Sequence, residues 1–352
     1  MKKLKGVCIG AGYFSQFHFE AWQRIEEVNI VGVCDMDIEK SKTICEKNGF
    51  KNAYTDVAEI FEKEQPDFVD IITPPETHLE LCLLAVKFGI HIICQKPLAP
   101  KYSQAEHIAE AIRASEVRLM VHENYRFQPW HREIKKLLDS NIIGEHLHSI
   151  NLRMRMGDGW QEDAYMNRQP YFREMRKLLI YETGIHFIDV FRYLGGEINK
   201  VYAKLKTLNK NIKGEDFAWV QFEFEKGALG FLDANRYNEN TAEDPRLTFG
   251  AVLIEGNEGS LRLYDDGSIT IQKLGEKETK HDYPFKNINF SGDCVYTTQK
   301  HFIQNLISGN SFETEIFDYL KNILIQDAIY TSNKKGIPVT IPLSTTAILQ
   351  LI

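Results

Sequence analysis

Residues 6–22, GVCIGAGYFSQFHFEAW, decide the fold of the first part of the chain. A short apolar run ends in Gly10 and Gly12, and an amphipathic segment typical of a helix follows directly, with Ser15 at the third small position. Glycine at the first two positions permits a tight turn and lets the backbone approach a pyrophosphate, which binds at a helix N-terminus. The stretch therefore predicts the strand, turn and helix of a dinucleotide-binding unit.

The next apolar run, VGVCD, ends on Asp35, which is placed to accept hydrogen bonds from an adenosine ribose. A carboxylate at this position repels a 2′-phosphate, and no Arg or Lys immediately follows it. The sequence thus favours NAD over NADP as the cofactor. A glycine turn without a ligand is the weaker alternative, because the strand, the helix and the acidic residue all accompany the turn.

Short apolar runs such as FVDIIT, HIIC and VRLMV alternate with amphipathic stretches through the first third of the chain. This alternation is the signature of βαβ units and of a parallel sheet buried on both faces. One helix is expected over residues 103–115, where Ser103 and Glu106 form a capping-box pattern. Residues 1–122 are therefore predicted to form a Rossmann dinucleotide-binding domain of the α/β class.

From about residue 199 to 274 the pattern changes to consecutive strands, joined by turns at EKG, GNEG and DDG. Helical segments are expected before these strands, near residues 128–140 and 178–194, and after them, near residues 294–308 and 313–333. Residues 123–352 are therefore predicted to form an α+β domain with a large open, mostly antiparallel sheet.

Composition argues against several classes of partner. A length of 352 residues suggests about two domains, and a net charge of −7 argues against nucleic acid. No apolar run approaches the ~18 residues that span a bilayer, so no membrane segment is expected. The six cysteines are scattered and the N-terminus lacks a signal-peptide pattern. These features favour reduced thiols, no bound metal and a cytoplasmic location.

Two strand ends carry further candidates. Thr73 and Pro74 end one buried strand, in ITPPETH, and Gln95 and Lys96 end the next, in HIICQKP. The carboxyl ends of parallel strands meet at one edge of a sheet, where ligands bind. Lys96 is therefore expected to point toward the bound cofactor. The alternative is an exposed lysine at a strand end, stopped by a proline.

Residues 178–195, LLIYETGIHFIDVFRYLG, predict an amphipathic helix. Glu182, His186, Asp189 and Tyr193 fall on one strip beside an apolar stripe, at spacings that make them neighbours on a helix. The two carboxylates and the imidazole on this strip suit a catalytic site. A solvated helix face is an equal alternative from the pattern alone, and a metal site is disfavoured because no further ligands cluster nearby.

Taken together, the motifs GAGYFSQFH, TPPETH, QKPLA, NYRF and ETGIHFIDVFRYLGGEI resemble those of the Gfo/Idh/MocA oxidoreductases. The resemblance implies an NAD(P)-binding Rossmann domain and a second domain for substrate binding and oligomerisation. Lys96 matches the lysine of the family's Glu-Lys-Pro motif, with Gln95 in place of the glutamate. His186 matches the family histidine, and Glu182 stands where aspartate is frequent.

The resemblance implies hydride transfer between NAD and a secondary hydroxyl of a sugar, inositol or related polyol. His186 is expected to take the hydroxyl proton, Lys96 to stabilise negative charge on the oxygen, and Glu182 to assist them. The expected cofactor contacts are Gly10, Gly12, Tyr13, Phe14, Asp35, Thr73, Pro74, His78, Gln95 and Lys96. The expected substrate contacts are Tyr125, Arg126, Trp160, Arg168, Glu182 and Asp189, with Tyr165 as a further candidate and Asn235 and Tyr237 as weaker ones. For the aromatic and arginine residues, an aromatic core with a solvated loop is at least an equal alternative.

Two alternatives stay open: an NAD-dependent glycoside hydrolase or eliminating enzyme of the same superfamily, and a non-catalytic cofactor-binding regulator. The combination of Lys96 with His186 argues against the regulator. A large open sheet would expose an apolar face, and the resemblance implies pairing through it. A homodimer or homotetramer formed through this sheet is therefore expected.

Overall fold

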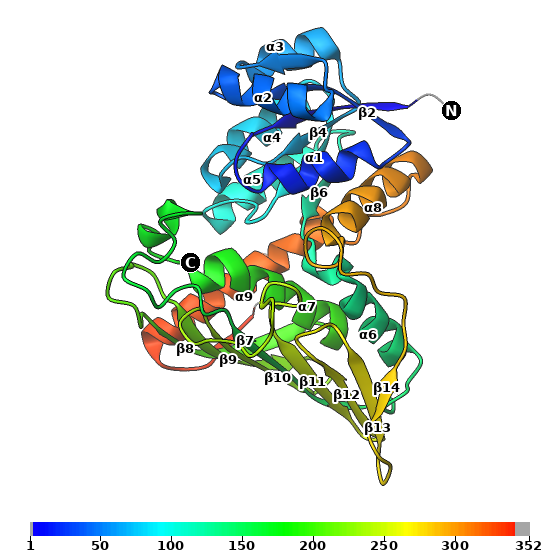
Figure 1. Ribbon diagram of the computed structural model, residues 1–352, viewed down its shortest axis with the longest axis vertical. Coiled ribbons are helices and arrows are strands. Elements are labelled where there is room, and N and C mark those ends of the chain that lie inside the picture. Colours follow the sequence, from blue (N-terminus) through cyan, green and yellow to red (C-terminus); the bar gives the residue numbers. More distant parts are fainter. Residues whose placement is uncertain (1–2, 342–352) are drawn as a thin grey trace. The chain divides into compact units, whose positions relative to one another are not determined.

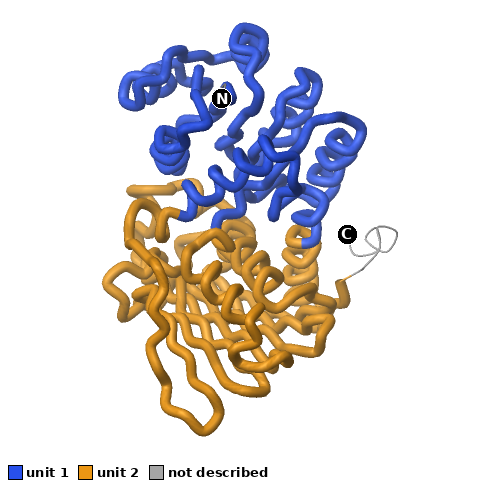
Figure 2. Tube along the Cα trace, turned by 90° about the vertical axis from the view of Figure 1, so that its right-hand side faces the viewer, with its two compact units in different colours: residues 1–124, 294–321 blue, residues 125–293, 322–352 orange. Residues whose placement is uncertain are grey.

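A computed structural model describes residues 3–341, and within them the chain forms two compact units (Figures 1 and 2). The first unit runs through Asn124 and also contains Cys294–Lys321. The second contains Tyr125–Asp293 and the described residues from Asn322 onward. No helix within residues 3–341 has both the length and the apolar character needed to cross a membrane.

The first unit is built on a six-stranded parallel sheet with the strand order β3-β2-β1-β4-β5-β6. Its strands are β1 (Leu4–Ile9), β2 (Val28–Cys34), β3 (Asn52–Tyr54), β4 (Phe68–Ile71), β5 (His91–Gln95) and β6 (Leu119–His122). Its connecting helices are α1 (Ser15–Gln23), α2 (Ile38–Asn48), α3 (Val57–Glu64), α4 (His78–Lys87), preceded by the short 3-10 helix η1 (Pro75–Thr77), and α5 (Tyr102–Arg113). The strand order reverses between β1 and β4, which is where ligands bind in sheets of this kind. The predicted Rossmann fold is confirmed.

Local sequence explains several helix ends. Asp37 and Asp56 cap α2 and α3, because each carboxylate accepts a hydrogen bond from a backbone N–H in the first turn. Gly49 ends α2 in the left-handed conformation, with φ of 70°. The capping box expected at Ser103 is wrong: α5 begins at Tyr102 after Lys101, with no side-chain cap.

The segment α8 (Cys294–Ser308) and the start of α9 (Ile316–Lys335) belong to the first unit, although the sequence pattern assigned them to the second domain. The ring of Phe302 packs against Phe68, with centroids 5.6 Å apart. The Thr314 carbonyl accepts a hydrogen bond from the Val121 N–H at 2.9 Å, next to the end of β6. These contacts join segments about 190 to 230 positions apart in sequence, which no local pattern could indicate.

The second unit contains a nine-stranded sheet in the order β14-β13-β12-β11-β7-β10-β9-β8-β15. Its strands are β7 (Leu147–Arg155), β8 (Ile198–Lys206), β9 (Phe217–Phe224), β10 (Leu229–Asn235), β11 (Ala251–Gly256), β12 (Gly259–Leu263), β13 (Ile269–Lys273), β14 (Thr279–His281) and β15 (Val339–Thr340). Neighbouring strands are antiparallel except for β7 and β10. The predicted large, mostly antiparallel sheet is confirmed.

Helices lie along one face of this sheet (Figure 1). They include α6 (Pro129–Asp139), α7 (Ile185–Gly195) and the continuation of α9. The short helices η2 (Tyr125–Phe127) and η3 (Pro170–Arg173) and the π-helix η4 (Leu179–Gly184) belong to the same unit. The other face carries a hollow that includes the side chains of Trp219, Phe231 and Leu253. Trp219 is 37% exposed, so this face leaves large apolar groups in contact with solvent.

Candidate functional site

The glycine-rich turn between β1 and α1 requires glycine at its first position. Gly10 has a φ of +106°, and a Cβ there would lie 3.0 Å from the carbonyl carbon of Ile72. Gly12 differs, because a Cβ there would meet no described atom within 4 Å. The Ser15 hydroxyl donates a hydrogen bond to the Gly12 carbonyl at 2.7 Å, where α1 begins. The turn thus leaves open space beside a helix N-terminus, which fits a dinucleotide pyrophosphate.

Asp35, directly after β2, stabilises this turn through hydrogen bonds. Its Oδ2 accepts a hydrogen bond from the Ala11 N–H at 2.7 Å, and its Oδ1 accepts one from the Asp37 N–H at 3.0 Å. Each carboxylate oxygen has a further lone pair for a ribose hydroxyl. No basic side chain directly follows Asp35, since the next residues are Met36 and Asp37. The residues present therefore fit NAD. Of the other expected contacts in this turn, Tyr13 is exposed and Phe14 is half-buried.

His78 contacts the backbone of the loops that follow β4 and β5. It is fully buried, with Nε2 at 2.8 Å from the Thr73 carbonyl oxygen and Nδ1 at 3.0 Å from the Leu98 carbonyl oxygen. Burial lowers the pKa of His78. The imidazole therefore links the loop after β4, which carries Thr73 and Pro74, to the loop after β5. Its polar atoms face protein backbone, although the sequence suggested a cofactor contact.

Lys96 follows β5 directly, and its side chain is half-buried. The peptide bond between Lys96 and Pro97 is cis. Gln95 is buried, and its Oε1 accepts a hydrogen bond from the Lys96 N–H at 2.8 Å. The Gln95 amide nitrogen lies 3.0 Å from Nε2 of His18. Gln95 thus contacts the interior of its own unit, and Lys96 occupies the carboxyl edge of the sheet that the sequence predicted.

His186 lies in the first turn of α7 and is held by an aromatic ring. The Tyr125 ring stacks on the imidazole with centroids 3.9 Å apart and an interplanar angle of 3°. Both side chains are buried, and Tyr125 also contacts Phe187 and Phe249. This stack fixes the plane of the imidazole. Tyr125 was predicted from sequence as a substrate contact, and here one face of its ring covers His186.

Asp189 and Arg126 pair with one another. The Arg126 guanidinium donates from Nε and Nη2 to the two carboxylate oxygens, at 2.7 and 2.6 Å, and the Asp189 side chain is fully buried. The Asn322 amide donates a further hydrogen bond to Asp189 at 2.8 Å, and Arg192 donates to Asn322. Arg126 and Asp189, both predicted as substrate contacts, therefore connect η2, α7 and α9 through hydrogen bonds. Asp189 lies about one helical turn after His186 in α7.

Glu182 lies in the π-helix η4, whose wider turns shift the side-chain spacing expected for a regular α-helix. The strip of Glu182, His186 and Asp189 predicted from sequence is therefore interrupted before His186. The Glu182 carboxylate accepts a hydrogen bond from the Thr183 hydroxyl at 2.7 Å and lies 3.8 Å from the Arg236 guanidinium. It is half-buried. Single-turn π-helices are frequent at functional sites.

Arg236, directly after β10, is a buried residue that was not predicted from sequence, although its neighbours Asn235 and Tyr237 were. Its guanidinium donates to Asp158 at 3.2 Å and to the Thr183 hydroxyl at 3.1 Å. Burial acts to lower the pKa of Arg236, but the charges of Asp158, Tyr165 and Glu182, together with the hydrogen bond to Asp158, outweigh it, and the pKa is raised. The sequence signal that could have identified Arg236 is its position as a basic residue directly after a predicted strand.

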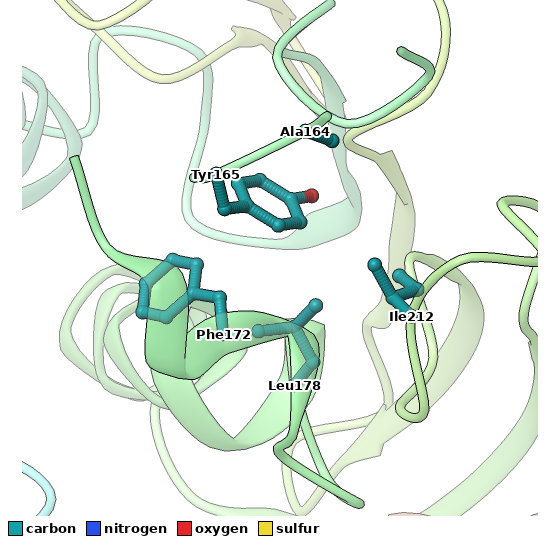
Figure 3. Packing of buried hydrophobic residues seen from close by; sticks show 5 residues of the cluster. All are labelled: Ala164, Tyr165, Phe172, Leu178 and Ile212. Atoms are coloured by element: carbon teal, nitrogen blue, oxygen red, sulfur yellow. The ribbon is translucent and has the colours of Figure 1, made fainter. Parts of the chain in front are cut away.

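The loop that carries Asp158 contains three more predicted substrate residues. Tyr165 belongs to a buried cluster with Ala164, Phe172, Leu178 and Ile212 (Figure 3). Arg168 donates to Asp158 at 3.2 Å, and Trp160, which is 48% exposed, donates to Glu239 at 2.8 Å. Asn235 accepts backbone N–H groups in the turn after β10, while Tyr237 is exposed. No group of three or more His, Cys, Asp or Glu side chains converges to hold a metal within residues 3–341.

Comparisons with known proteins agree with this architecture. The family model described as oxidoreductase family, NAD-binding Rossmann fold, matches residues 4–123, and that of the GFO/IDH/MocA C-terminal domain matches residues 131–262. A D-apiose dehydrogenase from Paraburkholderia graminis is 31% identical, over 96% of this chain and 89% of the relative. A myo-inositol 2-dehydrogenase from Thermotoga maritima is 25% identical, over 86% of this chain and 87% of the relative.

Among solved structures, an oxidoreductase from Agrobacterium radiobacter in complex with NAD+, L-tartaric acid and magnesium superimposes with a TM-score of 0.89. It is 28% identical, and the match covers 97% of this chain and 99% of that one. Both domains of the family are matched, and the similarity to the relatives runs through nearly the whole sequence. The chain therefore belongs to the Gfo/Idh/MocA family of oxidoreductases.

Proposed function

We propose that this protein is a dehydrogenase that transfers a hydride between a CH–OH group of a sugar, inositol or related polyol and NAD. The observation that carries the proposal is that the glycine turn, Asp35 and Lys96 all follow strands of one parallel sheet at their carboxyl ends. The named relatives, which act on apiose and on inositol, support the substrate class.

NAD, when bound, supplies a nicotinamide ring that accepts or returns the hydride. Gly10, Gly12 and the N-terminus of α1 bind its pyrophosphate, and Asp35 binds the adenosine ribose. The same carboxylate disfavours a 2′-phosphate, which supports NAD over NADP.

His186 takes the hydroxyl proton as the hydride leaves carbon, because a neutral imidazole accepts protons readily near neutral pH. Its stack on Tyr125 keeps the ring in one plane while the proton moves. Lys96 donates a hydrogen bond to the substrate oxygen and stabilises the negative charge that develops there. Glu182, held by Thr183 beside Arg236, binds a neighbouring hydroxyl. In the reductive direction His186 returns the proton.

The protein acts in the cytoplasm as a homodimer or homotetramer formed through the nine-stranded sheet. All six cysteines are buried and free, which suits a reducing compartment. The sheet face with Trp219, Phe231 and Leu253 exposes apolar groups flanked by the charges of Arg153 and Asp233. A second copy of the same face would cover these groups, as in symmetric dimers.

The test is NADH absorbance during incubation of the protein and NAD with a panel of inositols, aldoses and deoxy sugars, alongside titration of NAD binding. Net NADH formation that falls in both Lys96→Met and His186→Ala supports the proposal. Hydrolysis of a glycoside without net NADH would favour the hydrolase alternative. Tight NAD binding with no turnover of any sugar or glycoside would favour the regulator.

A further inference from the structure

A buried polar cluster lies behind the end of β5 in the first unit. Asp70, His18, Gln95 and His122 come from β4, α1, β5 and β6, and each side chain is at most 6% exposed. Nδ1 of His18 lies 2.8 Å from Oδ2 of Asp70, and the same oxygen accepts a hydrogen bond from the Trp22 indole at 2.7 Å. The Gln299 amide nitrogen lies 3.5 Å from the same oxygen. Hydrogen bonds among buried side chains restrict which of their atoms carry protons.

The heavy-atom positions assign the proton on His18. A carboxylate only accepts hydrogen bonds, so the proton of His18 sits on Nδ1, facing Asp70. A backbone N–H only donates, so the Gln95 atom that meets the Lys96 N–H at 2.8 Å is the carbonyl Oε1. The Gln95 NH₂ group therefore faces Nε2 of His18 at 3.0 Å, and this nitrogen must accept. His18 is neutral in this arrangement.

The second histidine fits the same pattern. Nδ1 of His122 lies 3.5 Å from the Gln95 amide nitrogen, on the side of its other N–H. The rings of His18 and His122 are 4.2 Å apart and tilted by 31°. Two positive imidazolium rings at this separation would repel each other in a buried site. A glutamine, whose two N–H groups donate to both rings, suits a pair of neutral imidazoles.

Glutamate at position 95 would change this pattern. Its two oxygens only accept, so the nitrogen of His18 that faces it would need a proton in addition to the one facing Asp70. The ring would then be an imidazolium between two carboxylates. The other titratable groups facing the cluster are Asp70, His122 and the thiols of Cys8 and Cys94, whose pKa values burial raises, with a further contribution from Asp70.

We propose that Asp70, His18 and Gln95 form a positioning chain for Lys96, and that glutamine at position 95 keeps both histidines of the cluster neutral. Asp70 fixes the tautomer of His18, His18 fixes the orientation of the Gln95 amide, and Gln95 holds the backbone N–H of Lys96. The inference deepens the function proposed above, because it rests on Lys96 acting on substrate.

The first test separates the two hydrogen bonds of His18. In His18→Asn the amide overlies Nδ1, so it keeps the bond to Asp70 but offers no acceptor to Gln95. In His18→Gln the amide overlies Nε2, so it keeps the acceptor but loses the bond to Asp70. Positioning of Lys96 predicts that kcat falls roughly tenfold to a hundredfold in His18→Asn and less in His18→Gln.

If His18 serves only as a hydrogen-bond donor to Asp70, His18→Gln should lose more thermal stability and more kcat than His18→Asn. That order, or equal kcat values, would overturn the proposal. NAD titration of each variant confirms that the first unit is folded. A chain that fails to fold in either variant leaves the decision to the second test, which changes neither His18 nor Asp70.

The second test reads the proton directly and needs no substrate, so its outcome is independent of whether the proposed reaction is right. The full chain is labelled with 15N-histidine, and the His18 signals are identified in the wild type by through-space contacts with the Phe14 ring, whose centroid lies 5.6 Å from that of the imidazole. The wild type should show neutral His18 with the proton on Nδ1 at neutral pH, and Gln95→Glu should show imidazolium. A charged His18 in the wild type, or a neutral one in Gln95→Glu, would overturn the proposal.

Discussion

Replacement of Asp189 by Asn tests whether this carboxylate holds the second unit together or contacts substrate. The change keeps the shape of the side chain and removes its charge. It leaves the Arg126 guanidinium buried beside a neutral amide, whose NH₂ group would face a donor in place of an acceptor. The Arg126 side chain is 9% exposed and Asp189 is fully buried, so water cannot compensate.

The size of the effect follows from this burial. Removing one partner of a buried ion pair costs about 3–5 kcal/mol, because the other charge stays uncompensated. A domain of this size loses about 2–4 °C of Tm per kcal/mol, so the Tm should fall on the order of 10 °C. Thermal unfolding of the full chain, followed by circular dichroism or calorimetry, measures this loss.

Glu39→Gln is the matched control. It makes the same chemical change in the pair of Glu39 and Lys42, whose side chains are 75% and 54% exposed. An exposed pair of this kind contributes less than about 1 kcal/mol, so this variant should unfold close to the wild type. A wild-type Tm in Asp189→Asn, together with a raised KM for the sugar, would refute the structural role and make Asp189 a substrate contact.

The pair can also be replaced as a unit. In Arg126→Met combined with Asp189→Leu, no charge of the pair remains buried. Apolar replacements of buried ion pairs are frequently close to neutral, so the double variant should lose less stability than Asp189→Asn alone. If the double variant is at least as unstable as Asp189→Asn, the stability loss in Asp189→Asn does not come from the uncompensated charge of Arg126.

Further predictions concern the turn, the cofactor, the sheet and pH. Gly10→Ala should weaken NAD binding and lower the Tm, because its Cβ meets the Ile72 backbone, whereas Gly12→Ala should leave the Tm nearly unchanged. Asp35→Ala should weaken NAD binding and reduce the discrimination against NADP in parallel titrations; unchanged preference would contradict its ribose role. Phe231→Arg should lower the mass measured by light scattering if the sheet face pairs two copies, and an unchanged mass would contradict that interface. Burial raises the pKa of Glu215, so the folded state binds its proton more tightly than the unfolded chain. The stability of the wild type relative to Glu215→Gln should therefore fall as pH rises above the ordinary glutamate range, and a difference constant with pH would contradict this.

Local pattern was sufficient for the Rossmann fold. The turn at Gly10 and Gly12, the acidic residue at the end of β2 and the run of buried strands are all properties of short stretches. Lys96 could be placed at the carboxyl edge because every strand of a parallel sheet ends there.

The central strand of the second sheet escaped prediction. The segment of β7 alternates more and less buried residues, but strands of this sheet were expected only from about residue 199 onward. The partners of β7 are β10 and β11, about 80 to 100 positions later, so nothing near it marks its place in the sheet.

The roles of site residues depended on contacts that are distant in sequence. Arg126 and Asp189 lie 63 positions apart, and each alone looked like a polar group available to a sugar. Their mutual pairing appears only when η2 packs against α7. Arg236 was missed for the same reason, because Asp158 lies 78 positions before it.

The most direct test of hydride transfer assisted by His186 is a single-turnover measurement of NADH formation at saturating NAD. The substrate is the sugar selected by the panel, with hydrogen or deuterium at the reacting carbon, and the wild type is compared with His186→Ala. We expect deuterium to slow the wild type, and His186→Ala to lower the rate by roughly two to four powers of ten with NAD binding retained. NADH formation at the wild-type rate in His186→Ala, without an isotope effect in either protein, would contradict this expectation.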